Sequence, residues 1–84
     1  MKYFCVSYDL VGKNRSNDYD KVDTTLIEEF NGKRILGSVW ILTLTDNWNC
    51  EALMEDLKTI EGIEKKDRLL VSRIFGSFRI RNSL

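Results

Sequence analysis

The chain has 84 residues, of which 43% are hydrophobic and 31% are charged, a composition typical of one folded globular domain and not of a disordered segment. Lysine plus arginine equal aspartate plus glutamate at 13 each, so the net charge is zero. This balance argues against nonspecific electrostatic binding of nucleic acid by the whole surface, but it does not exclude a local basic patch. The chain has no histidine, which removes the commonest general base and the commonest transition-metal ligand, and its two cysteines lack metal-type spacing.

The first residues do not have the pattern of a signal peptide. One lysine precedes a short apolar run that already contains Ser7, Tyr8 and Asp9. No stretch approaches the ~18 apolar residues of a membrane span. We therefore expect a cytoplasmic protein that does not bind a membrane.

The segment KYFCVSYDL, residues 2–10, predicts the first strand. Its side chains alternate between apolar and more polar, which is typical of a strand with one buried face. Asp9 stands at the end of this strand, on the same face as Ser7, whereas Tyr8 points to the other face and is expected to pack. The next residues, VGKNRSND, predict a loop.

The segment DYDKVDTTLIEEFNGK, residues 18–33, predicts the first helix. Asn17 or Asp18 can cap its start, and Asn31-Gly32 is typical of a left-handed exit. The segment DNWNCEALMEDLKTIEG, residues 46–62, predicts a second helix capped by Asp46 or Asn49. Both segments carry an apolar stripe at helical spacing, so each helix is expected to cover a sheet.

Three further segments predict strands. GSVWILTLT, residues 37–45, is apolar on both faces, so we expect it to be covered on both sides, on one of them by a partner subunit. DRLLVSRIF, residues 67–75, and SFRIR, residues 77–81, follow the second helix and are separated by Gly76.

The order is therefore β-α-β-α-β-β, or β-α-β-β-α-β if a short strand lies between the first helix and GSVW. Either order favours an α+β domain in which two helices cover one face of an antiparallel sheet of four to five strands. That is a ferredoxin-like split βαβ fold, and its second sheet face is left for a partner.

The succession of these segments resembles the small CRISPR adaptation nuclease-like family. The resemblance is carried by a strand ending in SYDL, a helix opening DYDKV, a strand GSVWIL and the segment DRLLVSRIFG, and it spans about residues 2–76. It is greatest to the branch of uncharacterised relatives in which an SYDL strand precedes a STW-type strand and a D-x-LLV strand. Virulence-associated protein D, a small ribonuclease-like protein, is a more distant relative.

The resemblance implies a ferredoxin-like fold and a homodimer built through the sheets. In nuclease members of this family, the aspartate that ends the first strand is the metal ligand, and two copies face each other across the dimer axis. The resemblance therefore implies this role for Asp9. Other members are structural adaptors that hold DNA for an integrase without cutting it, so the fold alone does not establish an enzyme.

The nuclease hypothesis depends on a divalent cation at Asp9. Without histidine, hydrolysis of RNA or DNA needs Mg²⁺ or Mn²⁺ to activate water and neutralise charge on the phosphate. Mg²⁺ can sit on one or two carboxylates, so Asp9 suffices if a second copy contributes its own. Ser7 can orient a water or the carboxylate. The alternatives are that Asp9 accepts hydrogen bonds from amides just downstream, as turn residues do, and that Ser7 is an ordinary strand residue.

Two groups of basic residues are candidates for binding nucleic acid. Lys13 and Arg15, in the loop after Asp9, can contact a phosphate, although the alternative of a solvated loop explains them better. Arg73, Arg79 and Arg81 gather into a basic strip if the last two strands pair. The alternative is that these charges protect an edge strand from pairing with other chains.

Other patterns are weaker. Asp18, Asp20 and Asp23 are spaced so that they do not converge on one ion, and helix capping explains them better. Trp40 and Trp48 can stack on bases, but their positions favour packing. An RNA recognition motif needs aromatic residues where RLLVSRIF is aliphatic. A homodimeric nuclease-like protein remains the first hypothesis, and the alternative is a non-catalytic adaptor or inhibitor that binds a protein or nucleic acid through the same dimer.

Overall fold

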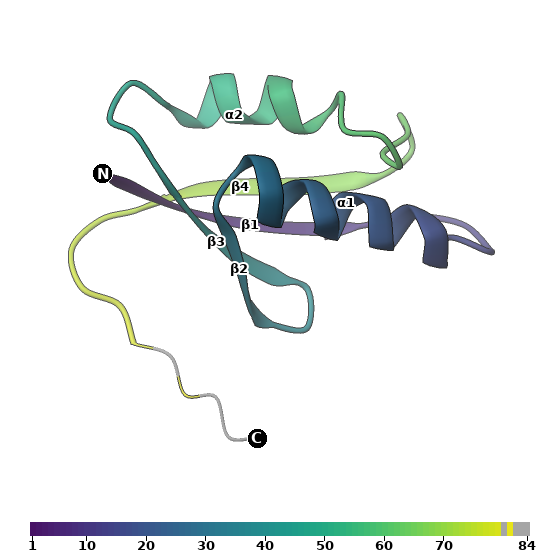
Figure 1. The fold of residues 1–84 in the computed structure, drawn as a ribbon, viewed down its shortest axis with the longest axis horizontal. Helices are drawn as coiled ribbons and strands as arrows, with labels where there is room; N and C mark the ends of the chain where they lie inside the picture. Colours follow the sequence, from purple (N-terminus) through teal and green to yellow (C-terminus); the bar gives the residue numbers. More distant parts are fainter. Residues whose placement is uncertain (80, 82–84) are drawn as a thin grey trace.

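The computed structural model describes residues 1–79 and 81 (Figure 1). Its elements, in chain order, are β1 (Lys2–Asp9), α1 (Ser16–Glu29), β2 (Gly32–Leu36), β3 (Val39–Leu44), α2 (Cys50–Leu57) and β4 (Arg68–Ile74). The strands form one sheet in the order β2-β3-β1-β4, and every neighbouring pair is antiparallel. This is the predicted ferredoxin-like split βαβ arrangement.

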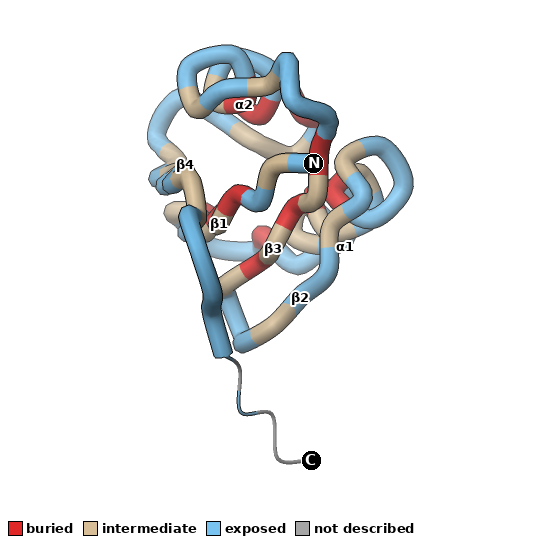
Figure 2. The backbone as a smooth tube through the Cα atoms, turned by 90° about the vertical axis from the view of Figure 1, so that its left-hand side faces the viewer, coloured by how far each residue is buried: buried red, intermediate tan, exposed pale blue. Residues whose placement is uncertain are grey.

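Both helices cover the same face of the sheet, and the core lies between the two layers (Figure 2). Successive side chains of a strand point to opposite faces, so only alternate residues of β1 and β3 enter this core. The buried residues of these two strands and of the helices are Phe4, Val6, Tyr8, Trp40, Leu42, Leu44, Val22, Leu26, Leu53 and Leu57. Burial of each large apolar side chain contributes about 1.5–3 kcal/mol, which fixes the helices on this face.

The sequence did not settle whether a short strand lies between the first helix and GSVW. β2 is that strand, so the order of elements is β-α-β-β-α-β. Asn31, just before it, has a φ of 50°, which confirms the predicted left-handed exit from α1. Gly32 is required by a close approach, because a Cβ at this position would lie 2.7 Å from the carbonyl oxygen of Leu26. The chain can therefore turn from α1 into β2 within two residues.

The prediction of a last strand over residues 77–81 is wrong for the residues that the structure describes there. β4 ends at Ile74, Gly76 takes a φ of 70°, and residues 77–79 and 81 belong to no strand, while Ile80 lies outside the described residues. Phe78 instead packs against Tyr3 of β1, with ring centroids 5.8 Å apart. The described sheet has four strands.

The start of α2 follows the sequence pattern, whereas the start of α1 does not. The side chain of Asn49 accepts a hydrogen bond from the amide of Ala52 at 2.8 Å, as expected of a helix cap. α1 begins at Ser16, before the predicted Asn17 or Asp18, and no side chain caps it. The Asp18 carboxylate is instead engaged by Nε of Arg15 at 2.6 Å.

Candidate functional site

The face of the sheet opposite the helices is covered by neither helix, and we call it the open face (Figure 2). The strand register places alternate residues of β1, β3 and β4 on it. They are Tyr3, Cys5, Ser7, Asp9, Val39, Ile41, Thr43, Arg68, Leu70, Ser72 and Ile74. Most are half-buried or exposed, and Leu70 is 58% exposed, so this face offers apolar surface to a partner.

Asp9 lies at the end of β1, on this open face and in solvent. Its carboxylate makes no hydrogen bond or ion pair with the residues that the structure describes. The amides just downstream, which a turn-type aspartate would engage, have other partners. The Leu10 amide donates to the Tyr19 hydroxyl at 3.0 Å, and the Val11 amide donates to the Asp67 carboxylate at 2.9 Å. The turn alternative for Asp9 is therefore wrong, and the carboxylate is free to bind a ligand.

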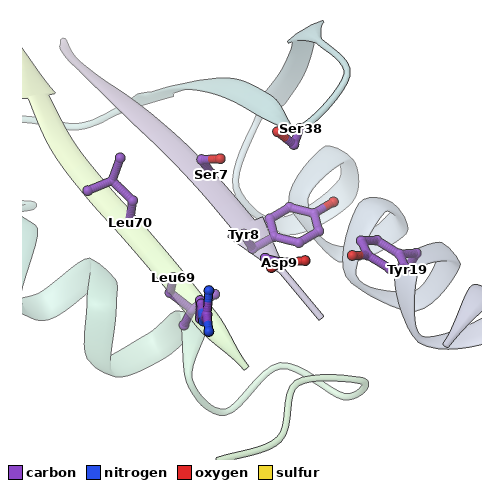
Figure 3. A pocket seen from close by; sticks show the side chains of 8 residues that line it. Ser7, Tyr8, Asp9, Tyr19, Ser38, Leu69 and Leu70 are labelled. Atoms are coloured by element: carbon purple, nitrogen blue, oxygen red, sulfur yellow. The ribbon is translucent and has the colours of Figure 1, made fainter. Parts of the chain in front are cut away.

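Ser7 shares the open face with Asp9, as the alternation predicted. In the register it stands between Val39 of β3 and Leu70 of β4. An open depression of about 320 Å³ lies at this end of the sheet (Figure 3). Its walls are formed by Ser7, Tyr8, Asp9, Tyr19, Ser38, Arg68, Leu69 and Leu70. The depression therefore brings the carboxylate of Asp9, the guanidinium of Arg68 and two serine hydroxyls to one place.

Tyr8 packs on the helix side, which confirms its predicted orientation. Its hydroxyl donates to the carboxylate of Asp23, which also pairs with Arg34. Burial raises the pKa of Tyr8 above its ordinary value, and the hydrogen bond to the negatively charged Asp23 raises this pKa further. The hydroxyl stays protonated near neutral pH, so Tyr8 is a structural residue and not a general base.

Arg15 is buried and holds together two loops. Its guanidinium donates to both carboxylate oxygens of Asp67 at 2.8 and 2.7 Å. The remaining N–H groups donate to Asp18 and to the carbonyl oxygens of Val11 and Gly62. All five donors of an arginine are then engaged, so in this position Arg15 has none left for a phosphate. The interpretation of Arg15 as a residue of a solvated loop is wrong, and we do not include it in the site.

The Arg15 guanidinium holds the pKa of Asp67 well below its usual range, despite the opposing effect of burial. The Asp67 side chain is 0% exposed and also accepts hydrogen bonds from the amides of Val11 and Glu64. This carboxylate is therefore charged at neutral pH and fully satisfied.

Lys13 remains a candidate for contact with nucleic acid. It lies in the loop between β1 and α1, is exposed, and forms no ion pair within the described part of the chain. Its side chain is therefore free to contact a ligand, but it does not line the depression beside Asp9.

The structure does not gather Arg73, Arg79 and Arg81 into one strip. Arg73 lies opposite Phe4 in the register, so it belongs to the helix side, and its guanidinium stacks on the rings of Phe4 and Phe75 at 5.8 and 4.4 Å. Arg79 is exposed in the segment after β4 and donates to the carbonyl oxygen of Phe78. Arg81 is exposed and outside any strand. The strip required a last pair of strands that the described residues do not form.

No group of three or more histidine, cysteine, aspartate or glutamate side chains within residues 1–79 and 81 is arranged to hold a metal ion. Asp18 pairs with Arg15, and Asp23 pairs with Tyr8 and Arg34, so these two acids have structural roles, as the sequence indicated for the acidic positions of α1. A single copy of the described chain thus supplies one free carboxylate, Asp9, to the depression.

The two tryptophans have packing roles. Trp40 is 1% exposed in the core, and the guanidinium of Arg34 lies 5.0 Å from its ring centroid. Trp48 packs against Phe30, with ring centroids 6.1 Å apart. Trp40 is therefore not free to stack on a base, and the half-buried Trp48 is engaged with Phe30.

Sequence reasoning missed Arg68 and Asp67. Arg68 opens β4 directly opposite Asp9, and Asp67 precedes it. The only available signal was the alternation of side chains along the segment DRLLVSRIF, which puts Arg68 on the same face as Leu70 and Ser72. The alternation within one strand does not reveal which residue of β1 lies opposite Arg68.

No protein-family model matches the chain, and a search of curated proteins found no match. Among the described residues, no helix combines the length and the apolar character that a bilayer crossing requires.

Proposed function

We propose that the chain works as a homodimeric, nuclease-like protein in which Asp9 of two copies holds one Mg²⁺ or Mn²⁺ ion for hydrolysis of phosphodiester bonds in RNA or DNA. The observation that carries the proposal is the exposed, unpaired Asp9 carboxylate at the end of β1, on a sheet face that neither helix covers. The resemblance to the CRISPR adaptation nuclease-like family gives the same role to this residue.

A second copy is needed because one carboxylate is a weak ligand set. Mg²⁺ prefers six oxygen ligands and binds through one or two carboxylates, with waters and substrate oxygens in the other positions. Asp9 and its symmetry mate would supply two carboxylates and leave the remaining positions open. Without the ion, the two negative charges would repel each other, so metal binding and dimer formation should support each other.

The open face suits such a dimer. A two-fold axis parallel to β1 and above it would bring Cys5, Ser7 and Asp9 opposite their own copies, whereas Tyr3 already packs against Phe78. Sheets that pack face to face lie about 10 Å apart, a gap that two side chains and an ion can fill. Ile41, Leu70 and Ile74 flank β1 on this face and would lose water-exposed surface, which favours association.

The proposed chemistry follows from the ion. A bound divalent cation lowers the pKa of its water and stabilises the negative charge that develops on the phosphate. Ser7, which is half-buried and on the same face, can accept a hydrogen bond from that water and fix its orientation.

The test is cleavage of labelled RNA and DNA with Mg²⁺ or Mn²⁺ by the wild type and by Asp9→Asn. Loss of an outer-shell partner of a metal ligand costs about 10- to 100-fold, so loss of the ligand itself should reduce the rate by at least about 100-fold. Asp20→Asn is the matched control, because Asp20 is an exposed carboxylate on α1, away from the open face. Equal rates for wild type and Asp9→Asn would contradict the assignment of Asp9.

The second candidate is a non-catalytic adaptor or inhibitor that uses the same dimer. It is favoured by the apolar exposure of the open face at Leu70 together with the zero net charge of the chain. This candidate predicts that purified wild type cleaves neither polymer with either metal, while the dimer persists.

A further inference from the structure

We propose that Arg68 binds a backbone phosphate of the nucleic acid, beside the ion held by Asp9. The proposal rests on the proposed function for the class of its ligand, but it concerns a different residue and a different interaction. Its basis is one juxtaposition: Arg68, the first residue of β4, lies directly opposite Asp9, the last residue of β1.

The register puts both side chains on the open face. Directly opposite residues of an antiparallel pair have Cβ atoms about 4.5–5.5 Å apart, so a ligand that contacts Asp9 is within reach of Arg68. Both residues line the same depression, with Ser7 and Leu70 as the next pair along the strands. A phosphate in this depression would meet Arg68 on one side and the Asp9-bound ion on the other.

The Arg68 guanidinium is uncommitted, unlike those of Arg15 and Arg34. It is exposed, and across residues 1–79 and 81 it forms no ion pair and no side-chain hydrogen bond. Arg15 is bound to Asp67, and Arg34 is bound to Asp23 and stacked on Trp40. The planar guanidinium of arginine matches two phosphate oxygens at once, which a lysine ammonium does not.

The competing role for Arg68 is a cross-strand ion pair with Asp9. Such a pair between two exposed groups is weak, because water and salt screen it. It also predicts no effect of Arg68 on binding of nucleic acid, so experiment separates the two roles.

The ion pair of Arg15 and Asp67 fixes the position of Arg68. Asp67 immediately precedes Arg68 and is buried, and its carboxylate accepts from the amide of Val11, two residues after Asp9. The ends of β1 and β4 are thus joined just beyond the two functional residues. The ion pair therefore orders the backbone at Arg68 before a ligand binds, and binding has to order only the side chain.

The experiment measures binding of fluorescein-labelled 20-nucleotide RNA and DNA, single- and double-stranded, by anisotropy at low salt in the presence of EDTA. Arg68→Ala should weaken binding of the preferred probe by about 10- to 100-fold, the range expected for one charge-assisted contact. Arg68→Lys should fall between Arg68→Ala and the wild type. Lys58→Ala is the control with the same change in charge, because Lys58 follows α2 and pairs with Glu55. Circular dichroism verifies that each variant is folded.

Equal affinity of Arg68→Ala and wild type, equal losses in Arg68→Ala and Lys58→Ala, or no binding of any probe by the wild type would overturn the proposal. Asp9→Asn separates it from the proposed function. Without metal, this variant should bind the probe at least as tightly as the wild type, because a negative charge beside the phosphate is removed. If Asp9→Asn cleaves normally while Arg68→Ala loses binding, the role of Asp9 is wrong and that of Arg68 stands.

Discussion

Arg15 and Asp67 form a buried ion pair in which two N–H groups of the guanidinium donate to the two oxygens of one carboxylate, at 2.8 and 2.7 Å. The pair joins the loop after β1 to the loop before β4, across 52 residues of sequence. These two loops lead away from Asp9 and toward Arg68, so the pair connects the stability of the fold to the shape of the candidate site.

We predict that Asp67→Asn strongly destabilises the protein. Removing one partner of a buried pair costs about 3–5 kcal/mol, because the other charge is left without compensation. Chemical denaturation of Asp67→Asn and wild type measures this difference in the free energy of unfolding. Asp20→Asn, which alters an exposed carboxylate, should change it by less than about 0.5 kcal/mol. A loss of less than about 1 kcal/mol for Asp67→Asn would contradict the structural role of the pair.

Protonation of the Asp67 carboxylate should lower the free energy of unfolding at acidic pH. The pKa of Asp67 is lowered in the folded state, chiefly by its hydrogen bonds to Arg15, whereas the pKa of an aspartate in the unfolded chain is about 3.9. The stabilisation is therefore complete above about pH 4–5 and declines as the pH falls below it. Thermal unfolding of the wild type from neutral pH down to about pH 2 should show a falling Tm, and Asp67→Asn should show a flatter profile. Parallel profiles for the two proteins would show that Asp67 does not contribute.

We predict that a charged side chain at Leu70, on the open face, disrupts the proposed dimer. Leu70 is 58% exposed on β4, so Leu70→Lys should leave the fold intact but disrupt a dimer that buries this residue. Light scattering at micromolar concentration should give about twice the chain mass of 9.8 kDa for the wild type and the single-chain mass for Leu70→Lys. Ile27→Lys, on α1 and 57% exposed, is the matched control and should remain dimeric. A wild-type monomer, or a dimer disrupted only by Ile27→Lys, would exclude association through the open face.

Cross-linking at Cys5 tests the orientation of the two copies. Cys5 is half-buried on the open face of β1, whereas Cys50 opens α2 in the helix layer. A short bismaleimide should join two chains through Cys5, and this product should persist in Cys50→Ser and disappear in Cys5→Ser. A direct disulfide is not expected, because face-to-face sheets keep the Cα atoms farther apart than the ~7 Å limit of a disulfide. Cross-linking that depends on Cys50 instead would place the helix layer at the interface.

The local pattern of β1 was enough to predict the face of the strand on which Asp9 lies. Alternation over residues 2–10 put Ser7 and Asp9 together and Tyr8 in the core, because strand periodicity is a property of neighbouring residues. β3 has apolar residues on both faces as predicted, but the helices bury only one of them, and of the two predicted caps of α2 it is Asn49 that caps the helix.

The wrong predictions concern contacts between distant parts of the chain. Arg15 was interpreted as a loop residue because its partner, Asp67, is 52 positions away and nothing local indicates the pair. Arg68 was overlooked for the same reason, since only the register of β1 with β4 reveals that it faces Asp9. Residues 77–79 have the alternation of a strand but pair with no strand of the described sheet, so the pattern alone misled.

The central claim is that two copies of Asp9 share one ion, and titration with Mn²⁺, followed by electron paramagnetic resonance of the free ion, tests it most directly. The claim predicts one tight Mn²⁺ per two chains in the wild type, loss of this site in Asp9→Asn, and a dimer that EDTA weakens. One Mn²⁺ per single chain, or equal binding by Asp9→Asn and wild type, would contradict it.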